Sequence, residues 1–170
     1  TIVLLGRTEL EEEPPGLEST RGENELRRAL SELARREGSG SGPAAIASQA
    51  SRISAVRDIR STLTELDKIG ARAEYASVDV RDATAVADVL NDVRTRSGPI
   101  TGILHGAGVV EDRYLADKTD DNFSAVFDTK VLGLKALLDA TDGDPLNSLF
   151  LFSSVSARFG NAGQSDYAMA

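Results

Sequence analysis

Residues 71–108 read ARAEYASVDV RDATAVADVL NDVRTRSGPI TGILHGAG, and this stretch decides the fold. It opens with a short apolar run at 71–80 and closes with another at 100–108. Between them, at helical spacing, the apolar side chains are Ala85, Val86, Val89, Leu90 and Val93. A strand, a helix with one apolar face and a second strand predict a unit whose two strands lie parallel.

The same alternation continues on both sides of this stretch. Apolar runs at 1–6 and 146–154 add two predicted strands. A long helix is predicted from Thr119, which is suited to cap it and is followed by two aspartates. The pattern therefore predicts an α/β fold with a doubly wound parallel sheet flanked by helices.

Residues 9–56 are too long for an ordinary strand-to-helix connection, so we interpret them as an insertion. An acidic, proline-containing start and the GSGSGP break at 38–43 are typical of linker, whereas the segments at 23–37 and 44–70 are predicted helices. The expected division is residues 1–8 and 57–170 as one partial domain and 9–56 as a helical insertion. A solvated helical excursion and a contact surface for another domain both remain open for it.

Composition excludes several classes of function. With 27 acidic and 19 basic residues the net charge is −8, which argues against nucleic acid or an anionic membrane as partner. No apolar run approaches the roughly 20 residues that cross a bilayer. No cysteine is present, and His105 is the only histidine, so a metal site built from several histidines is excluded and no metal is expected. A cytoplasmic location is expected.

In an open parallel sheet, ligands bind beyond the carboxyl ends of the strands. After the first run, Gly6 permits close approach, and Arg7 offers a guanidinium where an enzyme that uses NAD usually has a carboxylate for the ribose. A 2′-phosphate, and hence NADPH, is the favoured ligand. An arginine that is simply exposed in a loop is the alternative.

Two further strand ends carry candidate cofactor-binding residues. Asp79 and Val80 follow the second strand near an expected adenine position, although an aspartate there could equally cap the next helix. A turn of small residues that would admit a dinucleotide follows the third strand, at Gly106, Ala107 and Gly108. We expect the adjacent His105 to be a structural residue without a catalytic role.

Lys130 is an anomaly, since it falls within the apolar face of the predicted helix marked by Phe123, Val126, Phe127, Leu134, Leu137 and Leu138. Such a lysine either extends to solvent or points into a polar site. A buried ammonium beside a phenol would lower the pKa of that phenol from about 10 and make it a general acid. Tyr167 is the candidate phenol, and Ser154, after the fourth strand, would orient a carbonyl oxygen.

The segment LFSSVSARFGNAGQSDYAMA resembles the active site of short-chain dehydrogenases/reductases, which have a Rossmann-like fold. Together with LHGAGVVEDRYLADKTDDNFSAVFDTKVLGLKAL, it resembles ketoreductase domains of polyketide synthases and polyunsaturated fatty acid synthases. In that family a serine precedes the tyrosine by thirteen residues, as Ser154 precedes Tyr167. Its lysine lies in the preceding helix, as Lys130 does, whereas ordinary short-chain reductases have an asparagine in that helix and the lysine four residues after the tyrosine.

The resemblance implies NADPH-dependent reduction of a β-ketoacyl thioester on an acyl carrier protein. Tyr167 would protonate the oxygen, Ser154 would hold it and Lys130 would tune the tyrosine; other domains of the same synthase are the implied further partners. The resemblance also implies that a first strand with its glycine-rich turn precedes Thr1 and that further strands follow Ala170. A piece without them is expected to be inactive by itself. Val110, Glu111 and Asp112 resemble a signature of enzymes that form the 3R alcohol, with two of the three residues changed.

Two other functions remain open. A free-standing short-chain dehydrogenase predicts asparagine at position 130. A non-catalytic, Rossmann-like structural subdomain of a synthase typically lacks the serine, tyrosine and lysine, all three of which are present here.

Overall fold

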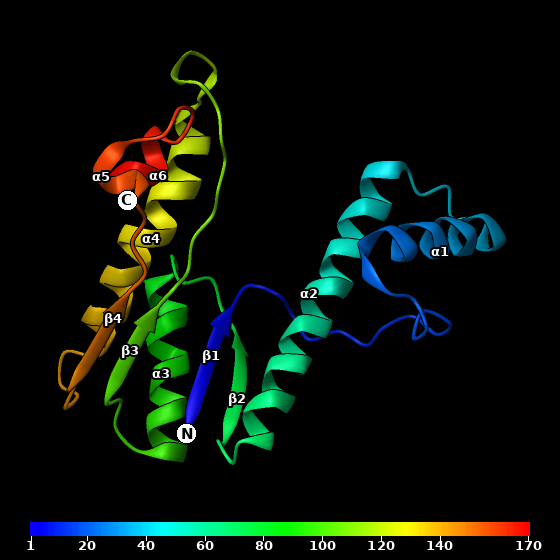
Figure 1. Ribbon diagram of the computed structural model, residues 1–170. Helices are drawn as coiled ribbons and strands as arrows, with labels where there is room; N and C mark the ends of the chain where they lie inside the picture. Colours follow the sequence, from blue (N-terminus) through cyan, green and yellow to red (C-terminus); the bar gives the residue numbers. More distant parts are fainter. The chain divides into compact units, whose positions relative to one another are not determined.

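The computed structural model describes residues 1–170 (Figure 1). The chain divides into two compact units, one formed by Thr1–Leu4 with Thr8–Ser77 and the other by Leu5–Arg7 with Val78–Ala170. Every candidate site residue identified from the sequence belongs to the second unit. None of the helices combines the length and the apolar composition needed to cross a bilayer.

The first unit contains two helices and most of a two-stranded sheet, whose first strand continues into the second unit at Leu5 and Gly6. Strand β1 (Ile2–Gly6) pairs with β2 (Ala73–Ser77), and α1 (Gly22–Glu37) packs against α2 (Pro43–Lys68). Both helices predicted in the insertion are therefore confirmed. The division proposed at residue 56 falls within the unbroken helix α2 and stays a prediction.

The insertion has a small core of its own, formed by Leu17, Leu26, Leu30, Ala50 and Ile53. Arg57 on α2 fastens the irregular segment before α1 to this core. Its guanidinium donates to the carbonyl oxygens of Leu17 and Thr20, each at 2.7 Å, and pairs with the Glu13 carboxylate. These contacts fix the position of a segment whose composition is typical of a linker.

The second unit places helices beside a second two-stranded sheet. Strands β3 (Gly102–His105) and β4 (Ser148–Leu151) run parallel, with Gly102 opposite Ser148 and His105 opposite Leu151. Helices α3 (Ala83–Ser97) and α4 (Asp120–Ala140) pack together (Figure 1). The buried core that they share with the sheet consists of Val78, Val86, Leu90, Ile103, Ala136 and Leu137.

The helix starts follow from their caps. Thr119 accepts the N–H of Asn122 and completes a capping box, which confirms its predicted role. Helix α3 is capped by Asp82, whose side chain accepts the N–H of Ala85 at 3.0 Å, so Asp79 does not cap it. The Asp79 carboxylate instead accepts hydrogen bonds from Arg81, two residues later in the chain.

The buried face of α4 differs from the predicted stripe. It consists of Val126, Thr129, Gly133, Ala136 and Leu137, whereas Leu138 is exposed. Small residues line this face because the helix passes very close to the segment after β2. A Cβ atom on Gly133 would lie 2.8 Å from Cγ2 of the buried Val80.

Two short helices end the chain, α5 (Ser156–Phe159) and α6 (Ser165–Met169). Helix α6 packs against both α4 and α5 (Figure 1). The loop that follows β3 includes one turn of 3₁₀ helix at Leu115–Asp117 before α4 begins. This arrangement brings the C-terminal segment to the middle of α4, where Lys130 lies.

Candidate active site

Lys130 connects two segments of the candidate site. Its Nζ lies 4.9 Å from the centroid of the Tyr167 ring and donates a hydrogen bond to the Phe152 carbonyl oxygen at 3.0 Å. The sequence left open whether this lysine extends to solvent or points into a polar site, and in the structure the residue is half-buried. A half-exposed ammonium keeps part of its hydration while its charge lies over the aromatic ring, a favourable cation–π geometry.

Ser154 lies directly after β4 and before α5 and is half-buried. Its Oγ accepts the N–H of Ser156 at 3.2 Å, which fixes the hydroxyl oxygen at the start of α5. Lys130 bonds to the carbonyl of Phe152, two residues earlier on the same segment. The lysine is thus attached to the chain segment that carries Ser154 and also contacts the ring of Tyr167.

The small-residue turn after β3 lies against the same lysine. A Cβ atom on Gly108 would come within 3.5 Å of Lys130 Cε, and one on Gly106 would come within 3.5 Å of the Phe152 ring. Larger side chains at these positions would occupy the space beside Lys130 and Phe152. Ala107, between them, is half-buried. The sequence predicted these three residues as cofactor-binding, and the structure places the two glycines beside Lys130 and Phe152.

His105 at the end of β3 is buried, and its Nε2 lies 2.9 Å from the Lys130 carbonyl oxygen. Because a carbonyl only accepts hydrogen bonds, Nε2 carries the hydrogen and donates it. The ring also lies beside Gly133, where a Cβ atom would approach its Cε1 to 3.5 Å. His105 therefore supports the backbone of the turn of α4 that carries the lysine, in agreement with the structural role expected for it.

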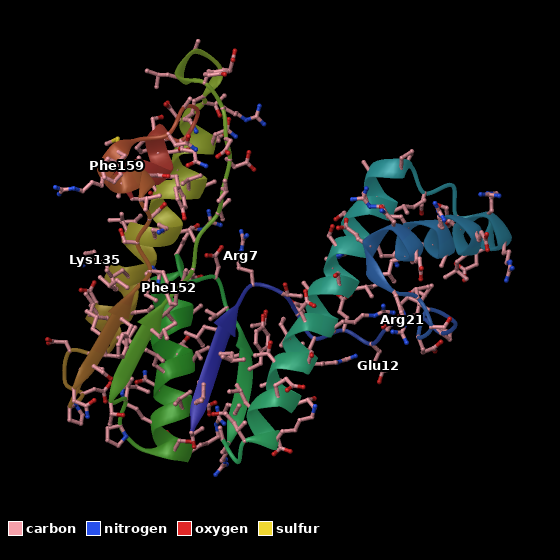
Figure 2. All side chains as sticks on the ribbon, viewed as in Figure 1. Arg7, Glu12, Arg21, Lys135, Phe152 and Phe159 are labelled. Carbon is pink, nitrogen blue, oxygen red and sulfur yellow. The ribbon has the colours of Figure 1, made fainter.

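Charged side chains gather at the ends of β1 and β2. Gly6 ends β1 and accepts the N–H of Val78 at 2.8 Å, and Figure 2 shows Arg7 just beyond it. The Arg81 guanidinium donates to both carboxylate oxygens of Asp79. Arg81 chiefly, with a smaller contribution from the charge of Arg7, lowers the pKa of Asp79 to about 2. Asp79 is therefore ionised at neutral pH.

Sequence reasoning missed a buried ion pair next to the tyrosine. Lys118 Nζ lies 2.6 Å from Asp166 Oδ2, with the two side chains 3% and 1% exposed. Gln164 donates to both carboxylate oxygens of Asp112, at 3.0 and 3.1 Å. These partners are 48 and 52 residues apart, so no local pattern could have paired them. Only the position of Asp166 directly before Tyr167 offered a signal.

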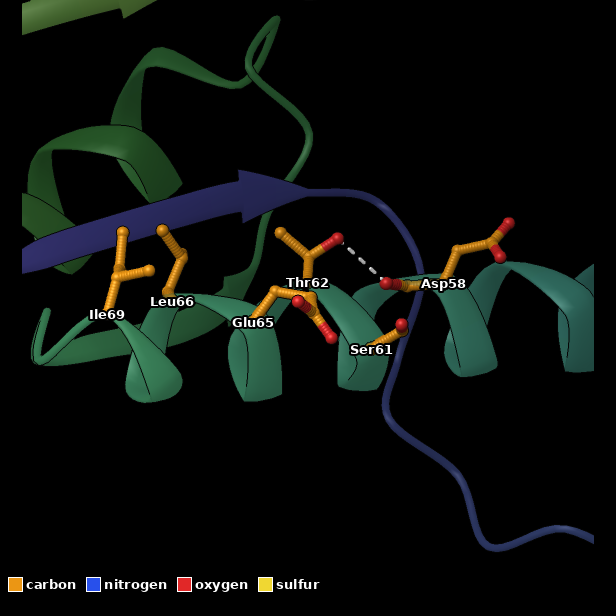
Figure 3. Close-up of a pocket in the computed structure, with 6 residues that line it drawn as sticks. All are labelled: Asp58, Ser61, Thr62, Glu65, Leu66 and Ile69. Atoms are coloured by element: carbon orange, nitrogen blue, oxygen red, sulfur yellow. Dashed lines mark hydrogen bonds between the residues drawn. The ribbon is translucent and has the colours of Figure 1, made fainter.

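A shallow depression with a volume of about 470 Å³ lies along α2 (Figure 3). Its residues are distant in sequence from Lys130 and Tyr167. Its lining comes from one helix and the residue after it: Asp58, Ser61, Thr62, Glu65, Leu66 and Ile69. The Thr62 hydroxyl is already bonded to the Asp58 carbonyl oxygen at 2.8 Å. No group of three or more histidine, aspartate or glutamate side chains is arranged to hold a metal ion. The candidate site is therefore the region around Lys130.

Comparison with known proteins gives the family. The KR domain family matches residues 22–170. One of the polypeptides that make up the polyunsaturated fatty acid synthase of Thraustochytrium sp. is 36% identical over 99% of the chain, which spans only 6% of that polypeptide. The chain is thus similar to a small part of a much larger protein.

Solved structures agree. A ketoreductase domain from the bacillaene assembly line is 41% identical, with a TM-score of 0.62, over 65% of this chain and 27% of that one. Carveol dehydrogenase from Mycobacterium avium, in complex with NAD, is 25% identical, with a TM-score of 0.60, over 67% of this chain and 43% of that one. These neighbours share the Rossmann-like fold of parallel strands flanked by helices that the sequence predicted. The chain belongs to the ketoreductase (KR) domain family of polyketide and polyunsaturated fatty acid synthases, within the short-chain dehydrogenase/reductase superfamily.

Proposed function

We propose that these residues form the catalytic region of a ketoreductase domain that reduces a β-ketoacyl thioester to the β-hydroxyacyl thioester within a multidomain synthase. The observation that carries the proposal is the position of the Lys130 ammonium over the Tyr167 ring, with the segment of Ser154 attached to the same lysine. The family membership supports it, because the chain is similar to parts of synthases. The thioester would be presented by an acyl carrier protein.

The proposed chemistry assigns one role to each of three side chains. The Tyr167 hydroxyl acts as general acid and transfers its proton to the ketone oxygen as negative charge develops there. The Ser154 hydroxyl donates a hydrogen bond to the same oxygen and orients the carbonyl. The Lys130 ammonium stabilises the negative charge that remains on the tyrosine oxygen after proton transfer.

We infer that the cofactor is NADPH, which when bound supplies the hydride that reduces the β-carbon. The residues present fit such a group. Gly106 and Gly108 leave the space beside Phe152 and Lys130 free of side chains, and Arg7 at the end of β1 offers a cation for a 2′-phosphate. Asp79 and Val80 follow β2 at the position proposed for the adenine. The NAD complex of the carveol dehydrogenase supports a nicotinamide cofactor in a related fold.

The test is a kinetic assay of the full-length polypeptide that carries this domain, with NADPH and a β-ketoacyl thioester on a carrier protein. NADPH oxidation is followed by absorbance for the wild type and for Tyr167→Phe, Ser154→Ala and Tyr114→Phe. Tyr114 is the matched control, because it is an exposed tyrosine of the loop after β3. We expect Tyr167→Phe to lower kcat by roughly 100- to 10,000-fold, Ser154→Ala to lower it by a smaller factor, and Tyr114→Phe to leave it unchanged.

Three outcomes would contradict the proposal. A wild-type protein without ketoreductase activity on any β-ketoacyl thioester would favour the non-catalytic structural subdomain. A wild type that reduces small free ketones as efficiently as carrier-bound substrate would favour a free-standing dehydrogenase. Full activity in Tyr167→Phe would remove the tyrosine from its assigned role.

A further inference from the structure

The buried ion pair between Lys118 and Asp166 has no role in the chemistry described above. Both side chains are almost completely removed from solvent, and their charged atoms are 2.6 Å apart. The Lys118 ammonium also donates to the Glu111 carbonyl oxygen at 3.0 Å. Charged groups are rarely buried this deeply, because desolvation of two ions offsets most of their attraction. A purely apolar pair could fill the same volume with equal or greater stability.

The Asp166 carboxylate has two partners at once. While Oδ2 binds Lys118, Oδ1 accepts the backbone N–H of Tyr167 at 2.9 Å. Each oxygen therefore fixes a different part of the structure, one the loop after β3 and the other the backbone of the tyrosine. An apolar residue at position 166 could fill space but could not make this second attachment.

Helix α6 needs such an attachment because it has only five residues, Ser165–Met169, and its N-cap residue Gln164 makes no side-chain capping bond. Helices of this length are not stable on their own and take their orientation from tertiary contacts. Two further hydrogen bonds join the loop after β3 to the segment at the start of α6. Arg113 donates its N–H to the Gly163 carbonyl oxygen at 3.0 Å, and the Gln164 side chain donates to Asp112. Of these attachments, the ion pair is the buried one, and its aspartate directly precedes Tyr167 in the chain.

We infer that Lys118 and Asp166 are positioning residues that orient α6 so that the Tyr167 ring lies over Lys130. The inference rests on the proposed function of Tyr167 for its catalytic consequence, but the geometric consequence holds whether or not the protein reduces a ketone. Neither residue contacts the reacting atoms in this account.

The test compares four variants in the full-length polypeptide: Lys118→Met, Asp166→Leu, the double variant Lys118→Met/Asp166→Leu, and Lys118→Arg. The readouts are kcat, KM, the thermal unfolding midpoint, and the distance from Lys130 Nζ to the Tyr167 ring centroid in structures from electron cryomicroscopy. A matched control is Lys135→Met/Asp139→Leu, which removes an exposed ion pair on α4 (Lys135 is labelled in Figure 2).

We expect each single apolar variant to lower the unfolding midpoint, since it leaves one buried charge without a partner. The unfolding midpoint of the double variant should return most of the way to the wild-type value. Its kcat should nevertheless stay about 100-fold below wild type, because the tyrosine is displaced. Its KM for NADPH should stay within twofold of wild type, and the lysine-to-ring distance should exceed about 6 Å, the limit of a cation–π contact. Lys118→Arg should retain more activity than Lys118→Met, and the control pair should leave all readouts unchanged.

Wild-type kcat and an unchanged 4.9 Å contact in the double variant would overturn the inference, because they would show that the ion pair serves stability alone. If the double variant does not fold, Asp166→Asn decides the question. An asparagine has one oxygen and can serve only one of the two partners, so a roughly tenfold loss of kcat is expected. Unaltered kcat in Asp166→Asn would contradict the inference.

A failure of the proposed function gives a different result. In that case the wild type lacks activity or Tyr167→Phe keeps it, while the lysine-to-ring distance in the double variant still reports on the role of the ion pair.

Discussion

Lys130 and Tyr167, 37 positions apart in the chain, come together with the lysine Nζ 4.9 Å from the centroid of the tyrosine ring. Helix α4 supplies the lysine and the short helix α6 supplies the tyrosine. A bond from the same ammonium to Phe152 ties both to the segment of Ser154. The proposed ketoreductase chemistry depends on this relationship.

Replacement of Lys130 by methionine should lower kcat by roughly 100-fold, since the negative charge on the tyrosine oxygen then lacks its neighbouring cation. The fold should survive, because a half-buried methionine fills the space of the lysine stem. Steady-state kinetics and a thermal melt of Lys130→Met measure both effects. Lys135→Met, on the exposed side of α4, is the control and should behave as wild type. Equal losses of kcat in Lys130→Met and Lys135→Met would mean that the net charge of α4, and not the contact between Lys130 and Tyr167, affects the reaction.

Gly133→Ala should destabilise the protein by about 1–3 kcal/mol, even though alanine is the better helix former. The new methyl group would lie 2.8 Å from Cγ2 of Val80, a buried and β-branched side chain that cannot easily rotate away. Chemical denaturation of Gly133→Ala measures the change in the free energy of unfolding. In the double variant Gly133→Ala/Val80→Ala the smaller side chain at position 80 makes room for the new methyl group. Its loss of stability should therefore be smaller than the sum of the two single losses. Strictly additive losses in the double variant would show that the two residues do not touch.

The Asp79–Arg81 ion pair predicts a dependence of stability on pH. The folded state lowers the pKa of Asp79 from 3.8 to about 2, so the stabilisation is complete well above pH 3.8 and is lost as the pH falls towards 2. Asp79→Asn should therefore be less stable than wild type at pH 6, by about 1 kcal/mol after screening of this partly exposed pair. The difference should shrink as the pH falls below 3.8 and should be small at pH 2, where the carboxylate is about half protonated. Urea denaturation at several pH values checks this, with Asp139→Asn as an exposed control. A difference at pH 2 as large as that at pH 6 would assign the effect to another cause.

Arg7→Ala should raise the KM for NADPH by roughly tenfold or more while it leaves the KM for NADH nearly unchanged, because only NADPH carries the 2′-phosphate that the guanidinium would bind. Parallel titrations of both cofactors at fixed substrate concentration measure the ratio. Arg158→Ala, on α5, serves as a control for the removal of an arginine from the same unit. An equal change for both cofactors would place Arg7 outside the phosphate site.

The sequence predicted the order of strands and helices because each element carries its own periodicity. The four strands and the helices α1 to α4 all appear, although the strands are shorter than their apolar runs. Residues 78–80, for example, lie outside β2 and instead bring Val80 against α4. Thr119 was recognisable as a cap because two aspartates follow it at the start of a helical pattern. Its observed partner Asn122 is only three residues away.

The contacts that orient the candidate site were not predictable in the same way. Lys118 and Asp166 carry no local pattern that joins them, and their pairing depends on where the loop after β3 meets α6. The small residues on the buried face of α4 were also missed, because a hydrophobic pattern does not reveal where a helix must approach its neighbour closely. The reason for a glycine at position 133 becomes evident only from the position of Val80 beside it.

The proposed hydride transfer is tested most simply with NADPH that carries deuterium at both C4 positions of its nicotinamide ring. The full-length protein is incubated with this cofactor and a β-ketoacyl chain on the carrier protein, and mass spectrometry follows deuterium into the chain. We expect one deuterium at the β-carbon with the wild type, and transfer at least 100-fold slower with Tyr167→Phe. Absence of label with the wild type, or equal rates for the two proteins, would contradict it.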